Sequence, residues 1–389
     1  MPFVIWGLGI LLFLFASFFI ASRVCRMLKR KPTWVRITVW GVVILLDFSF
    51  FLTRLLHSGC VAFSRALYIV STTWMPIVLY ASMAMAILCL ARLVIRKATG
   101  NDPYHTPLIV WISAAFTLCT VVAGYITATN TVDNRYEIYT EKFVKGESRR
   151  LVLVSDIHTG YAVTGKDVDR LVSDINRMSP DAVIIAGDLI DGDLLPVLKE
   201  NTCGKLSEIK ADGNVVATMG NHEYLDDDKE AEKYLRSIDG LTLLRDQTTD
   251  VCGMQIIGRD DVTHNNFYDK PRLKITDFNR ADSLFTIVVD HQPRVISDAE
   301  EIDADLYVGG HTHAGQIWPM NIITGILFSL DYGYGCYGNT NALVTSGFGT
   351  WGPRMRICTQ SEIVIIDIKG TGAPAETQEA PQENIEVEA

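Results

Sequence analysis

The sequence predicts an α/β domain that follows a four-helix membrane domain. Charge separates the two parts, because residues 1–128 contain only two of the 45 acidic side chains but eleven of the 35 Lys and Arg. The N-terminal third holds four long apolar stretches, whereas short apolar runs alternate with amphipathic segments beyond residue 150. This alternation favours βαβ units followed by a β-rich section. The formal net charge of −10 argues against a nucleic-acid binder, which carries a basic surface.

Four stretches are long and apolar enough to cross a bilayer, whose hydrocarbon core takes about 20 helical residues. They cover residues 3–22, 35–53, 67–91 and 107–127. The first is not typical of a cleaved signal peptide, because its basic cluster follows the apolar run. Four such runs with so few acids also argue against a buried soluble core. We therefore expect residues 1–128 to form a membrane domain and the protein to be integral to the cytoplasmic (inner) membrane.

Basic residues in the short loops predict the orientation of this domain. The loops after the first and third stretches carry most of them: Arg23, Arg26, Lys29, Arg30, Lys31, Arg36, Arg92, Arg96 and Lys97. These loops are expected in the cytoplasm, so the part beyond residue 128 is expected on the extracytoplasmic side. Asp47 is the only acid within an apolar stretch. It indicates either a hydrogen bond between helices or a functional site such as that of a transporter.

The elements of the α/β part follow from hydrophobic periodicity. Strands are expected at 151–154, 182–186, 214–218, 284–289, 305–308, 342–345 and 362–368, and helices at 166–178, 194–209 and 228–238. Residues 136–143 are also typical of a strand, which leaves only a short tether after the last membrane stretch. Residues 370–389 contain five Glu and no base, and predict a disordered acidic tail.

Polar side chains that can bind metals follow the carboxyl ends of several predicted strands, where α/β sheets form their ligand crevice. We expect these residues to converge in space: Asp156, His158, Asp188, Asn221, His222, His291, His311 and His313. Their imidazole nitrogens and carboxylate oxygens suit Mn, Fe, Zn, Ni or Co. The eight cysteines contain no CxxC pair and predict no structural zinc site, while disulfide pairing stays open.

The same residues occur in an ordered series of five motifs. The series is D-x-H at 156–158, G-D-x-x-D at 187–191, G-N-H-E at 220–223, the single His291 in DHQP, and G-H-T-H at 310–313. This series resembles the calcineurin-like metallophosphoesterase superfamily. The segments GHTHAGQIWP, SGFGTWGPRMR and SEIVIIDI resemble its bacterial membrane-associated branch. The resemblance covers about residues 133–369, and we expect the metallophosphoesterase domain to occupy residues 129–369.

The resemblance implies two packed β-sheets flanked by helices, with two divalent transition metal ions at the sheet edge. For the first metal it implies the ligands Asp156, His158 and His313. For the second it implies Asn221, His291 and His311. Asp188 would bridge the two metals, because a carboxylate has two oxygens.

The resemblance also implies how the site would work. A hydroxide that bridges the metals would attack the phosphorus atom of a phosphate ester. His222 would stand beside the scissile phosphate as the catalytic proton donor, and Asp191 would fix the tautomer of that imidazole.

One position departs from the family pattern. Gly192 stands where many members have an Arg that contacts the phosphate. A lower positive charge favours phosphodiesters or pyrophosphates over phosphomonoesters. Arg259 and Arg354 are candidate replacements, with structural salt bridges as the alternative interpretation.

The sequence therefore favours a membrane-anchored, dinuclear-metal phosphoesterase with phosphodiesterase activity. The short tether keeps its site near the headgroup layer, so lipid-linked or envelope phosphates are the preferred substrates. The main alternative is a catalytically silent membrane receptor or scaffold that binds a phosphorylated ligand, and a third hypothesis is a solute transporter with a regulatory domain.

Overall fold

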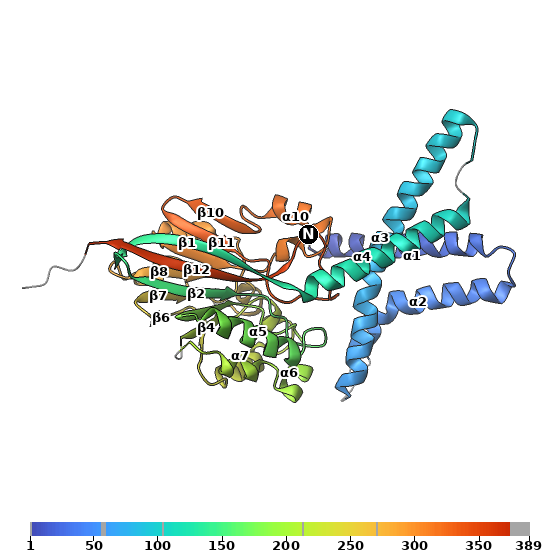
Figure 1. The fold of residues 1–389 in the computed structure, drawn as a ribbon. Helices are drawn as coiled ribbons and strands as arrows, with labels where there is room; N and C mark the ends of the chain where they lie inside the picture. Colours follow the sequence, from blue (N-terminus) through green and yellow to red (C-terminus); the bar gives the residue numbers. More distant parts are fainter. Residues whose placement is uncertain (1, 56–59, 103–104, 212–213, 270, 374–389) are drawn as a thin grey trace, which may run out of the picture.

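The protein consists of four apolar helices that extend from one end of a two-sheet domain (Figure 1). The computed structural model describes residues 2–55, 60–102, 105–211, 214–269 and 271–373. The helices are α1 (Pro2–Met27), α2 (Thr33–Leu55), α3 (Val61–Thr99) and α4 (Thr106–Thr129). Each has a segment long and apolar enough to cross a membrane, with a mean hydropathy of 1.9 to 2.2. The prediction of four long apolar helices at the N-terminal end, each a candidate membrane span, is confirmed.

Helix α3 is longer than a bilayer crossing requires. Its 39 residues would span about 58 Å at 1.5 Å per residue, against a hydrocarbon core of about 30 Å. Helix α3 contacts the second domain near its start and near its middle. Near its start, the Arg65 Nη2 atom donates to both carboxylate oxygens of Glu200, at 2.9 and 2.7 Å. Further along, the Tyr80 hydroxyl donates to the Trp318 carbonyl at 2.7 Å.

Asp47, the acid within α2, lies in the contact between three helices. Its Oδ1 atom accepts hydrogen bonds from the Ser17 hydroxyl of α1 and the Trp74 indole of α3, both at 2.8 Å. Polar side chains commonly join membrane helices in this way. The interhelical hydrogen bond explains this acid without a transport pathway.

The second domain contains two mixed six-stranded sheets. The first has the order β1 (Thr131–Val144), β12 (Ser361–Gly372), β2 (Ser148–Val154), β3 (Ala182–Ala186), β4 (Val215–Thr218) and β5 (Leu241–Leu244). The second has the order β10 (Gly333–Tyr337), β11 (Thr340–Val344), β9 (Leu306–Gly309), β8 (Phe285–Val289), β7 (Met254–Gly258) and β6 (Gln247–Val251). The predicted fold class, an α/β two-sheet sandwich preceded by four apolar helices, is confirmed.

The side chains of each strand alternate between two cores, as the period of a β-strand requires. Leu151 and Ile184 pack between the sheets against Ile287 of the second sheet. Val152 and Val183 point to the opposite face, which is covered by helices. The helices of the domain are α5 (Gly165–Met178), α6 (Leu194–Glu200), α7 (Asp228–Arg236), α8 (His264–Phe267), α9 (Ile296–Glu301) and α10 (Met320–Leu327).

The structure refines several predicted elements. The segment 194–209 is not one helix, because Asn201 adopts a left-handed conformation and separates α6 from the 3₁₀ turn Cys203–Glu208. Strands β5, β6, β7 and β10 were not predicted, and the mostly exposed residues QTTDV of β6 form no apolar run. Strand β12 continues to Gly372, and residues 374–389 of the predicted tail lie outside the described residues. No disulfide joins the cysteines of the described chain.

Candidate metal centre

The candidate ligands lie in loops that follow the carboxyl ends of strands β2, β3, β4, β8 and β9. Five of them have backbone conformations that L-residues rarely adopt, with φ of 54° at Asp156, 53° at His158, 53° at Asp188, 73° at His311 and 50° at His313. Such strained conformations concentrate at functional sites, where the surrounding structure holds them. Here the Asp156 amide donates to the Gly187 carbonyl at 3.1 Å, and the His158 amide donates to the Asp188 carbonyl at 3.0 Å.

Two motif glycines allow these loops to approach each other closely. A Cβ atom at Gly310 would lie 2.3 Å from the Asp156 carboxylate, and one at Gly220 would lie 2.2 Å from the Asp188 carboxylate. Any side chain at either position would push a candidate ligand away. The glycines of the G-N-H-E and G-H-T-H motifs are therefore required by packing against the carboxylates.

Three buried side chains form the first cluster: Asp156, His158 and His313. The Nε2 atoms of the two imidazoles lie 3.1 Å apart. The Asp156 Oδ1 atom lies 3.2 Å from His313 Nε2 and 3.7 Å from His158 Nε2. Three potential ligand atoms thus surround one point, as a metal site requires.

The second cluster contains Asp188, His291 and His311. The Nδ1 atom of His291 lies 2.8 Å from the Ala186 carbonyl, which can only accept a hydrogen bond. This contact places the proton on Nδ1 and directs Nε2 toward Asp188 Oδ2 at 3.1 Å. The same Oδ2 atom lies 3.6 Å from His158 Nε2 of the first cluster. Asp188 therefore joins the two clusters.

Asn221 completes the set of predicted ligands. Its Oδ1 atom is buried and has no hydrogen-bond partner among the described residues. It lies between Gly220, which packs against Asp188, and His222, whose amide donates to Asp188 Oδ1 at 2.8 Å. An orphaned buried carbonyl oxygen beside a carboxylate fits a metal ligand. Together the donors are consistent with a dinuclear site for divalent transition metals.

Electrostatics keep the two histidines of the G-H-T-H motif in the neutral form that binds metals. Burial, followed by the neighbouring charge of His291, lowers the pKa of His311 to about 3. Burial likewise lowers the pKa of His313 to about 4, with His158 and Arg356 adding to the effect. His158 behaves in the opposite way. Burial alone would lower its pKa, but the nearby carboxylates of Asp156, Asp191 and Asp188 raise it to about 10.

The predicted proton donor His222 and its partner Asp191, which we call the acid pair, lie beside the first cluster. The Asp191 Oδ1 atom lies 3.2 Å from His222 Nδ1 and 3.4 Å from His158 Nδ1. Burial would raise the pKa of Asp191, but hydrogen bonds with these two histidines lower it to about 2. The His222 side chain is 16% exposed, whereas those of His158 and His291 are fully buried. His222 is therefore accessible to a substrate, while the more deeply buried Asp191 contacts its Nδ1 atom.

Tyr68 of α3 was not recognised from the sequence as a site residue. Its hydroxyl donates to Asp191 Oδ2 at 2.6 Å, on the carboxylate oxygen that does not contact the histidines. Its ring lies 5.5 Å from the Tyr161 ring. In the sequence Tyr68 is one more residue of an apolar stretch, so no signal could have revealed the contact. A membrane helix thus supplies a hydrogen bond to the candidate acid pair.

We expect Tyr68→Phe to lower turnover of full-length protein about 10- to 100-fold. A hydrogen bond to a charged group contributes about 1.5–3 kcal/mol, and each 1.36 kcal/mol of barrier is a factor of ten. The loss should be larger for methyl phenyl phosphate than for methyl 4-nitrophenyl phosphate, because a poor leaving group needs the proton more. Tyr125→Phe on the exposed face of α4 is the control. Equal losses for both esters would show that Tyr68 does not act through the acid pair.

Two further residues support the ligands. Glu223 is buried and accepts hydrogen bonds from the amides of Gly220, Ile190 and Asp188 at 2.7, 2.9 and 3.2 Å. Its place in the G-N-H-E motif was a signal for this role. Arg356 is buried 3.3 Å from His313 Nδ1, and it donates to three backbone carbonyls of residues 346–349. Arg356 was not predicted as a site residue, although it belongs to the same GPRMR segment as Arg354.

The two arginines considered as phosphate contacts have structural partners. Arg354 pairs with Asp167 of α5, and Arg259 is buried with its guanidinium bound to the Leu273 carbonyl at 2.7 Å. Arg294 is a further candidate for a phosphate contact, and its Nε atom donates to Gln292 Oε1 at 2.7 Å. It is exposed, its guanidinium lies 5.3 Å from the Phe328 ring centre, and that ring contacts His311 at 5.9 Å.

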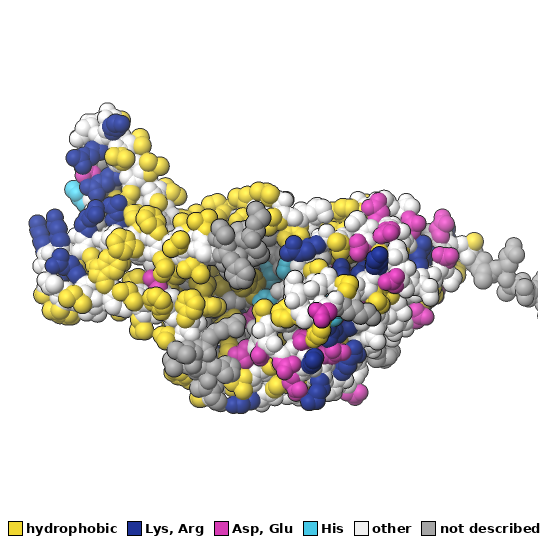
Figure 2. Space-filling model, turned by 180° about the vertical axis from the view of Figure 1, so that it is seen from behind, with side chains coloured by type: hydrophobic (Ala, Val, Ile, Leu, Met, Phe, Trp, Pro, Cys, Tyr) yellow, Lys and Arg dark blue, Asp and Glu magenta, His cyan; other side chains and the backbone are white. Residues whose placement is uncertain are grey.

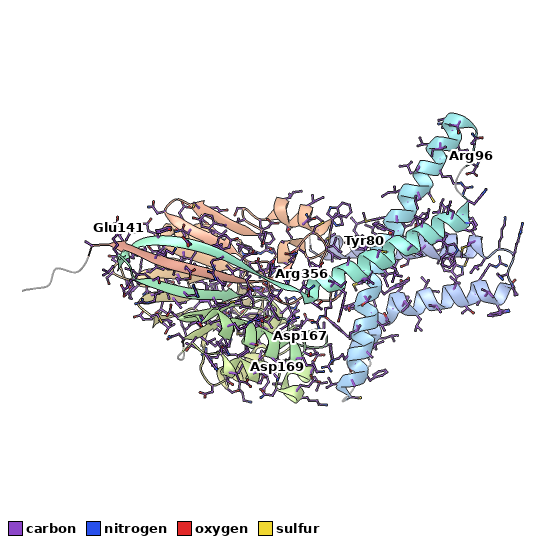
Figure 3. All side chains as sticks on the ribbon, in the orientation of Figure 1. Tyr80, Arg96, Glu141, Asp167, Asp169 and Arg356 are labelled. Carbon is purple, nitrogen blue, oxygen red and sulfur yellow. The ribbon has the colours of Figure 1, made fainter. Side chains whose placement is uncertain are left out.

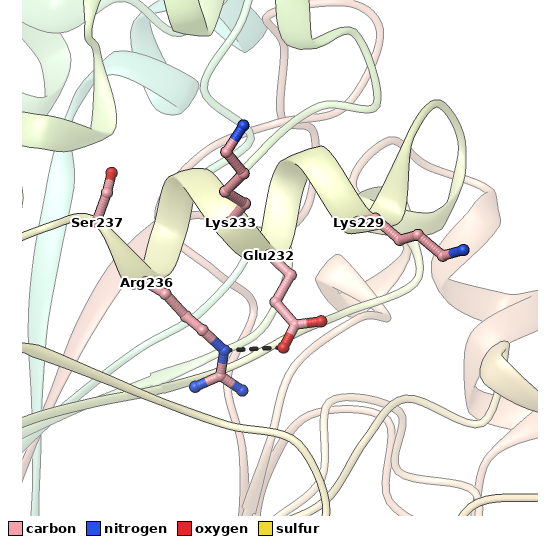
Figure 4. Close-up of a pocket in the computed structure, with 5 residues that line it drawn as sticks. All are labelled: Lys229, Glu232, Lys233, Arg236 and Ser237. Atoms are coloured by element: carbon pink, nitrogen blue, oxygen red, sulfur yellow. Dashed lines mark hydrogen bonds and ion pairs between the residues drawn. The ribbon is translucent and has the colours of Figure 1, made fainter.

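A separate surface hollow beside α7 has no connection with this centre. It is lined by Lys229, Glu232, Lys233, Arg236 and Ser237 (Figure 4). Glu232 and Arg236 pair along the helix at 2.8 Å, as residues four apart commonly do. None of the clustered histidines or their carboxylate partners lines the hollow.

Comparison with known proteins agrees with this geometry. Residues 149–315, which include most of the clustered side chains, match the family described as "Calcineurin-like phosphoesterase". The chain contains a calcineurin-like metallophosphoesterase domain. The family resemblance drawn from the five motifs is confirmed.

The chain is similar to proteins of bacteria and animals. It is 33% identical over 226 residues to an uncharacterized metallophosphoesterase of Campylobacter jejuni, covering 57% of this chain and 59% of that one. It is 30% identical over 252 residues to a zebrafish (Danio rerio) "transmembrane protein with metallophosphoesterase domain", covering 60% and 56%. The chain spans about three-fifths of the length of the first curated relatives that it matches.

Solved structures are similar to this chain at low identity. The precursor of a 5′-nucleotidase from Thermus thermophilus is 13% identical, covers 57% of this chain and 55% of its own, and has a TM-score of 0.35. Plasmodium GAP50, described as an anchor in the inner membrane complex, is 14% identical, covers 57% and 80%, and has the same TM-score.

Proposed function

We propose that this protein is a membrane-anchored phosphoesterase that works with two divalent transition metals. The observation that carries the proposal is the position of Asp188, whose Oδ2 atom lies 3.1 Å from His291 of one cluster and 3.6 Å from His158 of the other. A single carboxylate between two sets of imidazoles is the arrangement expected of a dinuclear site. Asp156, His158 and His313 would hold one metal, and Asn221, His291 and His311 the other.

The chain's own residues supply the remaining chemistry. When bound, the two metals provide a nucleophile at neutral pH and neutralise the charge on the phosphoryl oxygens. His222 donates a proton to the leaving oxygen from its partly exposed position. Asp191 Oδ1 lies 3.2 Å from His222 Nδ1 and orients the imidazole. Tyr68 fixes Asp191 from the side of the membrane helices.

A phosphodiester or pyrophosphate is the favoured substrate class. Gly192 leaves the site without the arginine that many relatives place there, and Arg259 and Arg354 are engaged elsewhere. A site with less positive charge discriminates less strongly against the single charge of a diester. A lipid or envelope phosphate fits the short distance between α4 and the first strand, which begins at Thr131.

The orientation proposed from the sequence places the phosphoesterase domain outside the cytoplasm. It is supported by the distribution of basic residues, because Arg96 lies at the end of α3 that is far from this domain (Figure 3). Figure 2 shows Lys and Arg gathered at the ends of the helices, and histidines in a hollow between the apolar helices and the charged domain surface. The positive-inside rule puts the basic ends in the cytoplasm.

The test uses the full-length protein in lipid nanodiscs loaded with Mn²⁺. We expect about two metals per chain and faster hydrolysis of bis(4-nitrophenyl) phosphate than of 4-nitrophenyl phosphate. Two bound metals without turnover of any ester would favour a receptor or scaffold that binds a phosphorylated ligand. A folded protein without bound metal would refute the site assignment.

A further inference from the structure

Helix α10 presents an unusually apolar surface for a domain outside the membrane. Its eight residues, MNIITGIL, carry no charge, and none of them is buried. Together with the preceding Trp318 it exposes a set of large apolar side chains that we call the α10 face: Trp318, Met320, Ile322, Ile323, Ile326 and Leu327. Ile326 and Leu327 are 78% and 71% exposed. Exposed apolar patches of this kind mark interaction sites.

The α10 face begins at the level of the membrane helices. Tyr80 of α3 donates to the carbonyl of Trp318, two residues before α10. Residues 66–91 of α3 carry no charged side chain, and Tyr80 lies near the middle of this run. Figure 3 shows Tyr80 and Arg356 at the junction between the helices and the sheets. The start of α10 is therefore anchored to the uncharged part of α3.

A second membrane helix approaches the same region. The Arg356 amide donates to the Gly124 carbonyl of α4 at 3.0 Å, and Ile317 forms a β-bridge with Ile357. The side chain of Trp351, in the same loop region, is 49% exposed. Tryptophan is enriched where membrane proteins pass through the boundary between lipid and water. The α10 face thus continues the apolar surface of α3 and α4.

Both ends of α10 also contact the ligand loops. Gly315, in the turn that starts at His313, packs so closely on Asn321 that an added Cβ would lie 2.1 Å from the Asn321 amide nitrogen. Phe328, directly after α10, contacts the His311 ring at 5.9 Å. The same short helix is therefore attached to one ligand of each metal cluster and to a membrane helix.

We propose that α10 lies in the leaflet next to the phosphoesterase domain and holds the hydrocarbon chain of a lipid phosphate ester. The phosphate of that lipid lies at the metal clusters, with Arg294 beside it, while its chain stays on the α10 face. This inference rests on the proposed function and specifies its substrate class. Bilayer lipid is the expected occupant because the face is uncharged and continuous with α3 and α4.

The test compares two esters that share the same phosphorus chemistry: hexadecyl 4-nitrophenyl phosphate and methyl 4-nitrophenyl phosphate. Full-length protein in phosphatidylcholine nanodiscs should prefer the hexadecyl ester. The double variant Ile326→Asp/Leu327→Asp should lower the hexadecyl-to-methyl ratio at least about tenfold and leave the methyl ester rate unchanged. Val144→Asp is the matched control, because Val144 is exposed near Glu141, at the end of the molecule away from the helices (Figure 3).

A second measurement does not depend on activity. Diazirine-labelled phosphatidylcholine in the nanodisc, after illumination and peptide mapping, should label the α10 peptide as well as α1 to α4, but not β1. Absence of label on α10, or an unchanged ester ratio in the double variant, would overturn the inference. A change from dimer to monomer in the double variant, with an unchanged ratio, would assign the face to a second copy and also overturn it. If wild type hydrolyses neither ester, the proposed function fails, while the lipid labelling still decides where α10 lies.

Discussion

Asp188→Asn is expected to abolish phosphoesterase turnover and to lower the bound metal from about two ions per chain to one or fewer. The substitution keeps the shape of the side chain but removes its charge and one of its two acceptor oxygens. The Oδ2 atom lies between His291 and His158, at 3.1 and 3.6 Å from their Nε2 atoms, and Oδ1 accepts from the His222 amide at 2.8 Å. Replacing a residue that merely orients a metal ligand costs about 10- to 100-fold, so removing the shared ligand should cost more than about 100-fold.

Metal analysis and turnover on the same preparation check this prediction. Asp282→Asn is the control, because the Asp282 side chain is 94% exposed and belongs to neither cluster. Retention of two metals and of more than a tenth of the activity would contradict the role of Asp188 as the shared ligand. A thermal melt of the metal-free proteins separates a folding defect from a loss of metal.

His222→Ala is expected to lower turnover about 100- to 10,000-fold while both metals stay bound. This range is the usual contribution of a positioned proton donor. The ring of His222 lies 4.5 Å from that of His158, yet its side chain is partly exposed and its Nδ1 atom faces Asp191 at 3.2 Å. The loss should be larger for methyl phenyl phosphate than for methyl 4-nitrophenyl phosphate, because 4-nitrophenolate leaves readily without a proton.

Steady-state rates for the two esters and the metal content give the result, with the exposed His105→Ala as the control. Loss of one metal in His222→Ala would assign this histidine to the ligand set instead. Combining His222→Ala with Tyr68→Phe gives an internal check. If Tyr68 acts only through Asp191 and His222, the double variant should be no slower than His222→Ala alone.

Many helices and strands were predictable, because the apolar pattern of each lies within a short stretch of sequence. Four apolar stretches define four helices, since a bilayer crossing demands uninterrupted apolar residues. Buried strands such as β3, with the residues AVIIA, are recognisable because both of their faces are covered. The mostly exposed β6 was missed because it pairs by backbone hydrogen bonds without an apolar signature. The buried strand β7, with the residues MQIIG, was also missed, because so short an apolar run does not by itself distinguish a strand from a helix.

The candidate ligands were also predictable from the chain, because each follows the end of a strand. Asp156, Asp188 and His291 come from β2, β3 and β8, in two different sheets. Periodicity and the strand-end rule indicated that such side chains converge, and the family motifs implied which metal each one would serve. The sequence could not provide the distances, such as the 3.1 Å between His291 and Asp188.

The sequence by itself determined the two-part organisation, the strand-end ligands and the family, because these depend on residue type and spacing along the chain. Only the tertiary structure decided how the two parts meet. Tyr68 reaches Asp191 across 123 positions, and Tyr80 reaches Trp318 across 238. Both tyrosines belong to a stretch whose composition predicts only a membrane helix. Their hydrogen bonds depend on where α3 packs against the phosphoesterase domain, and no local pattern encodes that contact.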